Sequence, residues 1–487
     1  MKQGFEAVIG LEVHVQLLTR SKMFCACRNE YGGVPNSRTC PVCLGLPGSL
    51  PVLNGEAVRM AIALGLALGG RIRERSTFYR KQYFYPDLPK GYQITQGPEA
   101  VVEGGQVRIP GDPQVRESAG RIMARVERAH LEEDAGKSSH DADPGHTCVD
   151  LNRAGVPLVE IVGAPDLRSG QEAYDYLKAV HRLVTFLDIC DGNLEEGSLR
   201  CDANISVRRW GAPLGTRVEV KNINSFRFVR QALDYEIDRQ IALVERGEAL
   251  TPETRGWDAD RGETRSQRGK EAAMDYRYFP EPDLPVLAIA EAEVEAVRRR
   301  LPELPDARFE RFTAQYGLSD YEAATLLQSR DFADFFEAVA HGGQGRQAAN
   351  WMLGEVSRAL NDRGRDLRDL GLRADHLAEL ICLVDQGGLT LTSAKETVFP
   401  ALLEGKEGPA AMVARLGLGQ VSDRGRIETL VRTVLAANPG QLAQYRGGKA
   451  NLRGFFVGQA MKAGKGQVNP QLVNEILDQL LAGGETP

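Results

Sequence analysis

Residues 9–17 show the clearest alternation of apolar and polar side chains in the sequence. One set of positions is aliphatic: Ile9, Leu11, Val13, Val15 and Leu17. The intervening positions include Glu12, His14 and Gln16. A period of two residues is typical of a half-buried β-strand, so we predict a strand here. A carboxylate, an imidazole and an amide in one row can bind a metal ion or act as acid and base, and a solvated sheet edge is the alternative.

Two later segments, residues 199–208 and 217–226, repeat this alternation. Their outward side chains are polar or charged: Arg200, Asp202, Asn204, Ser206 and Arg208 in the first segment, and Arg217, Glu219 and Lys221 in the second. The connection 209–215 is rich in turn-forming residues. The two segments are therefore predicted to form a β-hairpin.

Two further predicted strands carry acidic residues. The strand 122–131 is followed by three consecutive carboxylates at 132–134, and the strand 158–162 contains Glu160 within an apolar run. A buried carboxylate is costly unless it is paired with a cation. We therefore expect Glu160 to contact a basic side chain or a metal ion.

Helical periodicity appears in residues 171–186 and 229–246, and it dominates after residue 291, where strand patterns vanish. The pattern predicts an α+β protein, with a β-rich first domain followed by all-α domains. We place one boundary near residue 292 and a weaker one near 405. The expected domains are 1–292, 293–405 and 406–487.

Length and composition describe a soluble, multidomain protein. A chain of 487 residues is too long for one ordinary core, and 42% hydrophobic with 26% charged residues is typical of globular proteins. The longest apolar run, residues 60–70, is too short to cross a membrane. Because the N-terminus shows no signal peptide, we expect a cytoplasmic protein without membrane contact.

The distribution of charge is more informative than the net charge of −6. Residues 441–474 contain no Asp or Glu, although the segment is rich in basic residues: Arg446, Lys449, Arg453, Lys462 and Lys465. An acidic protein with one purely basic segment can present it to a polyanion such as RNA. The alternative is a chance run of charge on a solvated face.

Four of the eight cysteines form the pattern C-x-C, twelve residues, C-x-x-C: Cys25, Cys27, Cys40 and Cys43. Two close pairs joined by a turn-rich loop can surround a tetrahedral Zn²⁺ ion with four thiolates. The first pair is tighter than the usual C-x-x-C, and unmetallated thiols are the alternative. A closed four-cysteine site leaves no open coordination position, so the predicted zinc role is structural.

The stretch 77–96 is dense in aromatic residues and includes Arg80, Lys81 and Lys90. Its prolines and Gly91 argue against one continuous helix or strand. Aromatic rings beside cations suit a nucleobase or a phosphate. The alternative interpretation is an aromatic core loop.

The acidic rows point to a class of chemistry. Carboxylates that share one sheet face repel each other unless cations lie among them. Oxygen ligands suit Mg²⁺, which is commonly bound by one or two carboxylates and substrate phosphates, and neighbouring Arg and Lys can clamp phosphate. We therefore predict metal-assisted phosphoryl chemistry, with unrelated surface acids as the alternative. His14 is an unusual ligand for Mg²⁺ and could instead be a general base or a hydrogen-bonding residue of the sheet.

Seven segments together resemble the B subunit of the aspartyl/glutamyl-tRNA amidotransferases. They are residues 9–17 (IGLEVHVQL), 83–87 (YFYPD), 130–137 (HLEEDAGK), 195–206 (EEGSLRCDANIS), 219–225 (EVKNINS), 275–283 (DYRYFPEPD) and 457–471 (VGQAMKAGKGQVNPQ). The resemblance covers essentially the whole chain. Long motifs in this order are very specific.

The resemblance implies a reaction and partners. Such a protein uses ATP and Mg²⁺ to phosphorylate the side-chain carboxylate of Glu-tRNA(Gln) or Asp-tRNA(Asn), and ammonia then displaces the phosphate. Ammonia comes from glutamine hydrolysed by an amidase partner, the A-type subunit of the same complex, and a small C-type subunit lies at their junction. The chain lacks the Gly/Ser-rich amidase signature, which agrees with a need for that partner. We see no room for the inserted domain of the archaeal relative, which favours the three-subunit type.

The resemblance also implies roles for individual residues. Catalytic roles would fall on Glu12, His14, Lys81 and Glu133. Magnesium ligands would be Glu12, His14, Glu133, Glu160 and Glu219, and cofactor contacts would come from Arg200, Asp202 and Lys221. The basic residues of 441–474 match the expected tRNA contact. The cysteine cluster occurs in only some members, so zinc depends on the spacing alone.

Two other functions compete with this interpretation. A non-catalytic tRNA-binding scaffold would keep ATP-dependent amidation after Glu12 or Glu133 is changed to Gln. A phosphotransferase for a small molecule would keep its turnover after removal of residues 441–487. The sequence does not decide between Asp-tRNA and Glu-tRNA as substrate.

Overall fold

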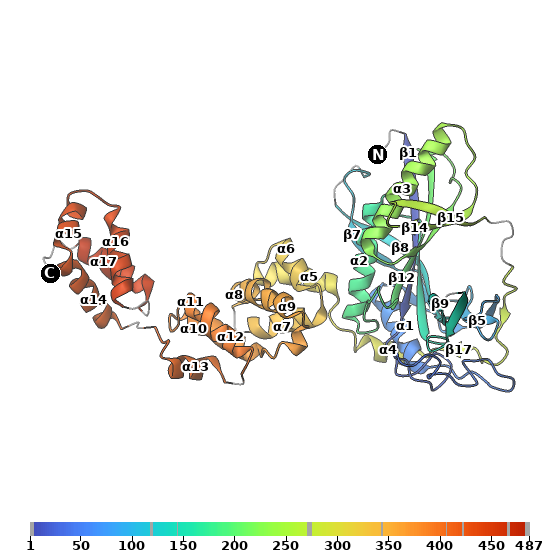
Figure 1. The fold of residues 1–487 in the computed structure, drawn as a ribbon, viewed down its shortest axis with the longest axis horizontal. Coiled ribbons are helices and arrows are strands. Elements are labelled where there is room, and N and C mark those ends of the chain that lie inside the picture. Colours follow the sequence, from blue (N-terminus) through green and yellow to red (C-terminus); the bar gives the residue numbers. More distant parts are fainter. Residues whose placement is uncertain are drawn as a thin grey trace. The chain divides into compact units, whose positions relative to one another are not determined.

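The structure is a computed structural model that describes residues 4–116, 120–143, 145–269, 275–341, 344–405, 407–420, 423–464 and 468–482. It divides into two compact units, Met1–Pro305 and Asp306–Pro487 (Figure 1). The first unit is β-rich and the regular elements described in the second are helices, which confirms the predicted α+β class. Within the described residues, no helix has both the length and the apolar character needed to span a bilayer.

One large mixed sheet is the framework of the first unit, with strands in the order β15-β14-β13-β12-β1-β11-β8-β5-β4-β16. Their bounds are β1 Phe5–Gln16, β4 Phe78–Gln82, β5 Tyr92–Gln96, β8 Arg121–Glu133, β11 Pro157–Gly163, β12 Leu199–Arg209, β13 Val218–Ile223, β14 Glu253–Asp258, β15 Glu263–Gly269 and β16 Phe279–Pro280. Neighbours are antiparallel except β13 and β14, which pair in parallel after a helical crossover through α3 (Phe226–Glu245).

Short strands extend the framework. Three of them join the β8 side of the sheet: β2 Arg71–Ile72, β6 Val102–Glu103 and β7 Gln106–Pro110. Two separate pairs are formed by β9 Lys137–Asp143 with β10 His146–Asp150, and by β3 Arg75–Ser76 with β17 Leu287–Ala288.

The strand predicted for residues 9–17 is confirmed as β1, which lies between β11 and β12. Its five aliphatic side chains are at most 1% exposed. The predicted hairpin is confirmed as the antiparallel pair β12–β13. By contrast, β8 continues to Glu133 rather than ending at residue 131 as predicted, so the alternation of faces also governs Glu132 and Glu133.

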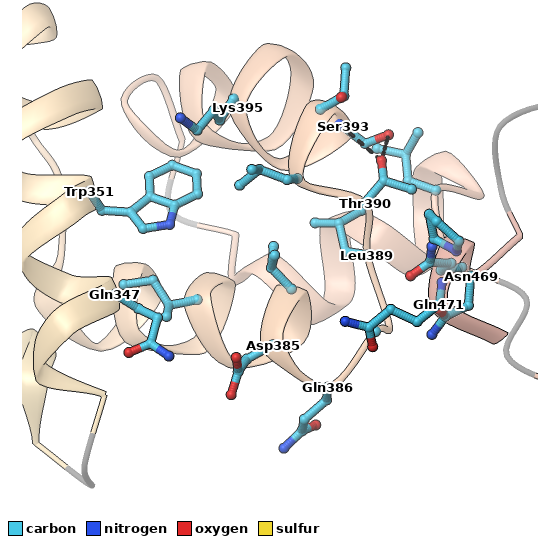
Figure 2. A pocket seen from close by; sticks show the side chains of 18 of the residues that line it. Gln347, Trp351, Asp385, Gln386, Leu389, Thr390, Ser393, Lys395, Asn469 and Gln471 are labelled. Carbon is cyan, nitrogen blue, oxygen red and sulfur yellow. Dashed lines mark hydrogen bonds between the residues drawn. The ribbon is translucent and has the colours of Figure 1, made fainter. Parts of the chain in front are cut away.

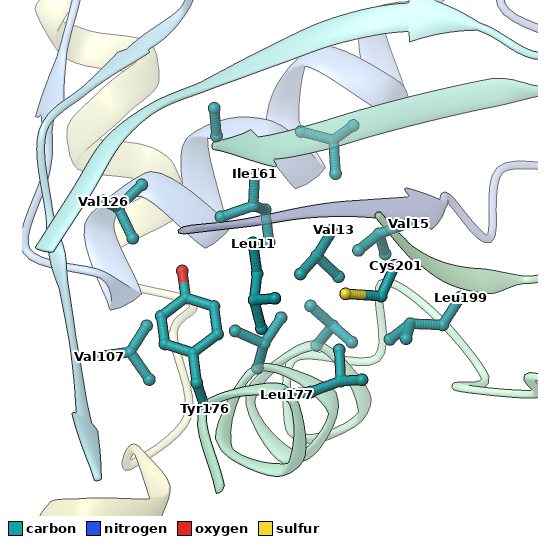
Figure 3. Packing of buried hydrophobic residues seen from close by; sticks show 14 of the residues in the cluster. Leu11, Val13, Val15, Val107, Val126, Ile161, Tyr176, Leu177, Leu199 and Cys201 are labelled. Atoms are coloured by element: carbon teal, nitrogen blue, oxygen red, sulfur yellow. The ribbon is translucent and has the colours of Figure 1, made fainter. Parts of the chain in front are cut away.

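Three helices cover the apolar face of the sheet: α1 Gly55–Ala67, α2 Gly170–Phe186 and α3. Figure 3 shows Leu11 and Val13 of β1 packed against Leu177 of α2. The N-caps fix where α2 and α3 begin, because the Ser169 and Ser225 hydroxyls accept hydrogen bonds from backbone N–H groups in the first turn. With its apolar face buried, the sheet presents its polar rows on the opposite face.

The second unit is built from helices in its described residues, as the sequence predicts. They are α5 Pro305–Tyr316, α6 Asp320–Leu326, α7 Arg330–Ala340, α8 Gly345–Trp351, η1 Met352–Val356, α9 Ser357–Arg363, η2 Leu367–Asp369, α10 Ala374–Asp385, α11 Leu391–Ser393, η3 Ala394–Val398, α12 Phe399–Leu402, α13 Pro409–Leu416, α14 Arg424–Ala437, α15 Pro439–Arg446, α16 Leu452–Ala463 and α17 Pro470–Ala482. The segment from α14 to α17 has its own apolar cluster around Phe456 and Leu477.

The first compact unit extends past the boundary predicted near residue 292. Helix α4 (Glu291–Arg298) packs against α1, and its Val294 and Val297 belong to the core of the sheet unit. The compact unit ends at Pro305. The domain boundaries near 292 and near 405 both stay predictions.

Candidate functional site

Four adjacent strands bring polar side chains into one row across the sheet. His14 of β1 lies opposite Glu160 of β11 on one side and Arg200 of β12 on the other. Glu160 in turn lies opposite His130 of β8. Residues directly opposite each other in an antiparallel pair have Cβ atoms about 4.5–5.5 Å apart, so the row is continuous.

Two of these side chains converge with Glu132 of β8, and we name His14, Glu132 and Glu160 the His14 centre. One ligand atom from each lies within 4.8 Å of the others. His14 Nδ1 is 3.4 Å from Glu132 Oε1 and 4.0 Å from Glu160 Oε2. Glu132 and Glu160 are only 4% and 13% exposed, whereas His14 is 20% exposed, so the centre is largely buried but reachable.

His130 of β8 lies beside the two carboxylates of the His14 centre. Its Nε2 lies 3.2 Å from Glu160 Oε2 and 3.6 Å from Glu132 Oε2. Among the described residues, the buried Nδ1 atoms of His14 and His130 stand out because neither makes a hydrogen bond. An unpartnered imidazole nitrogen facing two carboxylates is the donor set that a divalent cation uses, so the residues of the His14 centre fit a metal ion.

Charge interactions outweigh burial throughout the His14 centre. Burial raises the pKa of Glu132 and of Glu160, but the two histidines hold both carboxyl pKa values below their usual range. Burial lowers the imidazole pKa values, but the same carboxylates raise the pKa of His14 and raise that of His130 to about 9. The acids are therefore ionised at neutral pH, and a bound cation would compete with the imidazole protons.

Glu12 and Asp202 form the next row, opposite each other on β1 and β12. Asn204 Nδ2 donates a hydrogen bond of 2.9 Å to Glu12, whereas burial and then Glu160 raise the pKa of the Glu12 carboxyl. Lys221 Nζ lies 2.9 Å from Asp202 and 3.1 Å from Glu219. Glu12, Asp202, Glu219 and Lys221 thus continue the polar face away from the His14 centre, as the hairpin pattern predicts.

Lys81 approaches the same centre from β4. Burial lowers the pKa of the Lys81 ammonium. The interactions with Glu132, with Glu160 and with neighbouring tyrosines raise this pKa by more, so the net effect is a raised pKa. Its Nζ lies 5.1 Å from the centre of the Tyr276 ring. Lys81 is therefore a partly buried cation that the acids of the His14 centre stabilise.

Glu133 does not join the His14 centre, although the family resemblance implies a magnesium-binding role for it. Successive residues of a strand point to opposite faces, so Glu132 shares the face of His130 and Glu133 faces the other way. Its carboxylate forms an ion pair with Lys90 and accepts a hydrogen bond of 3.0 Å from the Ile94 backbone. Glu132, the acid of this pair that lies in the His14 centre, could have been found by continuing the alternation from Leu131 through the end of β8.

Arg200 is held at the edge of the polar face by Asp134. The two side chains lie 2.9 Å apart, and Gln16 Nε2 donates a hydrogen bond of 2.7 Å to the same carboxylate. Burial raises the pKa of Asp134, but Arg200 and Arg153 outweigh this and lower it. The guanidinium is thus fixed beside His14, although Asp134 partly neutralises its charge.

The four cysteines of the predicted zinc loop converge, with all four Sγ atoms within 4.8 Å of one another. The Sγ atoms of Cys40 and Cys43 are 3.9 Å apart, close to the roughly 3.8 Å expected of two thiolates on one tetrahedral zinc. Lys22 Nζ lies 3.8 Å from Cys43 Sγ. Hydrogen bonding from Cys25 and the charge of Lys22 help lower the pKa of Cys43 to about 5. This donor set fits zinc.

The predicted tRNA-binding residues lie between α15 and α17. Arg446 ends α15, Lys462 lies in the last turn of α16, and Lys449 donates a hydrogen bond of 3.2 Å to Gln444. Arg453 forms an ion pair of 2.7 Å with Asp478 of α17, so the acid-free segment has an acid beside it in space. Lys465 lies outside the described residues.

The second unit contains a separate cavity of about 1200 Å³. Figure 2 shows Gln347, Trp351, Asp385, Thr390 and Lys395 around it. None of the predicted site residues that the structure describes lines this cavity. The candidate site therefore remains the polar face of the sheet.

Two family models match the chain. The model described as GatB/GatE catalytic domain matches residues 7–295, and the one described as GatB domain matches residues 334–481. The first match spans the sheet, including the His14 centre and the cysteine loop. The class of protein is therefore one with a GatB/GatE-type catalytic domain followed by a GatB domain.

The similarity to known proteins extends over nearly the whole chain. Proteins named as the B subunit of aspartyl/glutamyl-tRNA(Asn/Gln) amidotransferase are 52% identical in Geobacter sulfurreducens, over 99% of this chain and 100% of the relative, and 52% identical in Alkalilimnicola ehrlichii, over 98% and 99%. A relative of the same name from Anaeromyxobacter dehalogenans is 53% identical over 98% of this chain and 99% of its own length. The chain belongs to the B-subunit family of these amidotransferases, which confirms the resemblance.

Proposed function

We propose that this chain converts Asp-tRNA(Asn), Glu-tRNA(Gln) or both into the corresponding amide, using ATP. A carboxylate is a poor electrophile, whereas an acyl phosphate is attacked readily by ammonia. The observation that carries this proposal is the His14 centre on the polar face of a domain that matches the family's catalytic domain. The family membership supports the tRNA-linked substrate and the transfer of an amide nitrogen.

His14, Glu132 and Glu160 would hold Mg²⁺, with Glu12 beside them. The ion would neutralise phosphate charge during transfer. Lys81, Arg200 and Lys221 border the same face and are suited to bind phosphate oxygens. Glu219 would keep Lys221 in place rather than bind the ion, because their side chains lie 3.1 Å apart.

The remaining roles follow the chemistry of each region. Ammonia would come from a glutamine-hydrolysing amidase partner, the A-type subunit. The small C-type subunit would belong to the same complex. The complex would act in the cytoplasm, where charged tRNA is used. The loop with Cys25, Cys27, Cys40 and Cys43 would bind structural Zn²⁺. The tail helices would contact tRNA through Arg446, Lys449 and Lys462, with Lys465 as a further candidate; Arg453 would contribute less because Asp478 pairs with it.

Replacing Glu132 by Gln in the reconstituted complex tests the proposal. ATP-dependent amidation should fall at least about 100-fold, because losing a metal ligand costs more than the 10–100-fold typical of outer partners. Binding of Mn²⁺ to the full chain, measured by electron paramagnetic resonance, should weaken in parallel. Glutamine hydrolysis by the partner should persist.

Two controls make this test specific. Glu127→Gln changes an exposed acid of the same strand and should leave both readouts unchanged. Glu133→Gln removes the acid of the opposite face and should leave Mn²⁺ binding intact. Normal amidation by the Glu132→Gln variant would support the scaffold alternative and contradict the proposal.

A further inference from the structure

A chain of tyrosine rings lies beside Lys81. The ring centres of Tyr83 and Tyr276 are 6.2 Å apart and those of Tyr276 and Tyr278 are 5.9 Å apart, each pair meeting edge to face. Lys81 Nζ lies 6.0 Å from the Tyr83 ring centre and 5.1 Å from that of Tyr276. We name Tyr83, Tyr276 and Tyr278 the tyrosine wall.

Two distant segments build the tyrosine wall. Tyr83 follows β4, and Tyr276 and Tyr278 precede β16, which pairs with β4. The backbone N–H of Gln82 donates a hydrogen bond of 3.0 Å to the Tyr276 carbonyl, and its Nε2 donates one of 3.2 Å to the Arg277 carbonyl. Arg277 has a φ of 44°, a conformation that costs energy for a residue with a side chain. Such strain is retained where a turn must place its neighbours, here Tyr276 against Lys81 and Tyr278 against Tyr276.

The hydrophobic core does not cover the rings of the tyrosine wall completely, because Tyr83 and Tyr276 are half-buried and Tyr278 is exposed. Tyr278 is 52% exposed, and the neighbouring Phe84 and Tyr85 are 85% and 52% exposed. In an edge-to-face pair only one of the two rings has a face covered by the other, so the pair does not bury every ring face. A cluster of exposed aromatic side chains is a mark of a binding surface rather than of ordinary protein surface.

The position of the tyrosine wall indicates its ligand. Lys81 lies against the wall. Its strand β4 pairs with β5, and Thr95 of β5 donates a hydrogen bond of 3.3 Å to Glu132, so the wall borders the His14 centre. Aromatic rings that solvent can reach beside a cation suit a nucleotide, because the base stacks and the phosphates or ester reach the charged groups. A protein partner would instead favour an apolar patch, whereas charged Arg277 and Asp275 alternate with these rings.

We propose that the tyrosine wall stacks a purine base and thereby directs the reactive end of the nucleotide to the His14 centre. This inference rests on the function proposed above. Two sources supply the same chemistry: the adenine of ATP and the terminal adenosine that carries the amino acid on tRNA. Stacking positions the substrate, so its loss changes binding more than turnover.

Substituting the rings in the complete complex tests this inference. Tyr276→Ala and Tyr278→Ala should raise one KM about tenfold with little change in kcat, since stacking of one base on an aromatic ring has about this effect. Tyr276→Phe and Tyr278→Phe should keep the wild-type KM. Trp210→Ala removes an exposed ring at the opposite end of β12 from Arg200, and should change neither constant.

The two sources are separated by which constant moves. A higher KM for ATP, with weaker binding of the fluorescent analogue ethenoadenosine triphosphate, identifies the adenine of ATP. A higher KM for aminoacyl-tRNA identifies the terminal adenosine. If ATP stacks on the wall, wild-type complex should prefer ATP to CTP, and the alanine variants should lose most of that preference.

Several outcomes would overturn the inference. Unchanged KM values in the alanine variants exclude stacking, and loss of complex assembly with unchanged KM values would identify the wall as an interface with a partner protein. If the alanine variants do not fold, the wild-type complex still tests the inference. Base stacking on the tyrosine wall is excluded if the wild type uses ATP and CTP equally and also has an unchanged KM for tRNA that ends in another nucleotide. Failure of the proposed function itself is distinguishable, because the wild-type complex would then show no ATP-dependent amidation.

Discussion

Glu132 and Glu133 show how one position along a strand separates two environments. Glu132 meets two imidazoles on the polar face, and Glu133 meets Lys90 on the other side. Both are acids at the end of the same alternating run, so composition alone does not distinguish them. Only the parity of the strand, fixed by the buried Leu131, assigns each acid to a face.

His181 of α2 is expected to make stability depend on pH. Burial lowers its pKa, and its ring meets Phe226 edge to face at 5.4 Å. The unfolded side chain titrates near 6.5, so below that pH the unfolded state binds the proton more readily than the folded state. This contribution to stability is therefore present above about pH 6.5 and is lost as the pH falls below it.

Urea unfolding at pH 7.5 and pH 5.5 tests this expectation. His181→Asn should show a smaller fall in the free energy of unfolding between the two pH values than the wild type. His341→Asn, at an exposed position after α7, serves as control and should match the wild-type difference. Identical differences in all three proteins would contradict the prediction.

Individual site residues can be predicted where they lie within one strand pattern. Alternation alone assigns Glu12, His14 and Asp202 to one face, and the register of β1 with β12 agrees with it. His130 is not selected, because a single histidine before an acidic run carries no local signal of its partners. Its meeting with Glu160 depends on the register between β8 and β11, which no local pattern encodes.

At the scale of elements, the sequence predicts the long central strands and the helices α2 and α3, but it predicts neither the short strands nor the order of the sheet. The predicted strands at 9–17, 158–162 and 199–208 exist, yet nothing in their patterns places the first between the other two. Such pairings are decided by packing of the whole core rather than by local propensity. The meeting of Tyr83 with Tyr276 depends on the same kind of long-range pairing.

The cysteine loop is an element whose shape is expected to depend on metal. We predict one Zn²⁺ per chain, measured by mass spectrometry of the purified protein. Replacing Cys40 and Cys43 by Ser should remove it and lower the melting temperature, since a site filled at about 1,000 times its Kd stabilises the fold by about 4 kcal/mol.

Cys148→Ser is the matched control, because this cysteine is exposed and lies outside the cluster. It should keep both the zinc and the melting temperature. The wild-type protein could purify without zinc and keep the same melting temperature when zinc is added. That result would show that the loop folds without a metal.

At the scale of the whole molecule, the division at Pro305 predicts which fragment folds. A fragment of residues 1–305 keeps α4, whereas a fragment ending at 292 loses Val294 and Val297 from the core. Burial of a valine contributes roughly 1.5–3 kcal/mol. The shorter fragment should therefore unfold at lower urea concentration.

Circular dichroism during urea unfolding measures this difference. The fragment 1–305 should also bind Mn²⁺ like the full chain, because every residue of the His14 centre lies within it. Equal stability of the two fragments would favour the boundary near 292 that the sequence pattern suggests.

The central place of β1 has a consequence for the newly made protein. The ribosome releases this strand well before the strands that flank it, which begin only at Pro157 and Leu199. Until both have emerged, a nascent polypeptide carries an apolar strand with two bare edges, which is the kind of segment that aggregates or recruits chaperones. If synthesis stalls before β12, β1 lacks one of its two neighbouring strands and the sheet of the first unit stays incomplete.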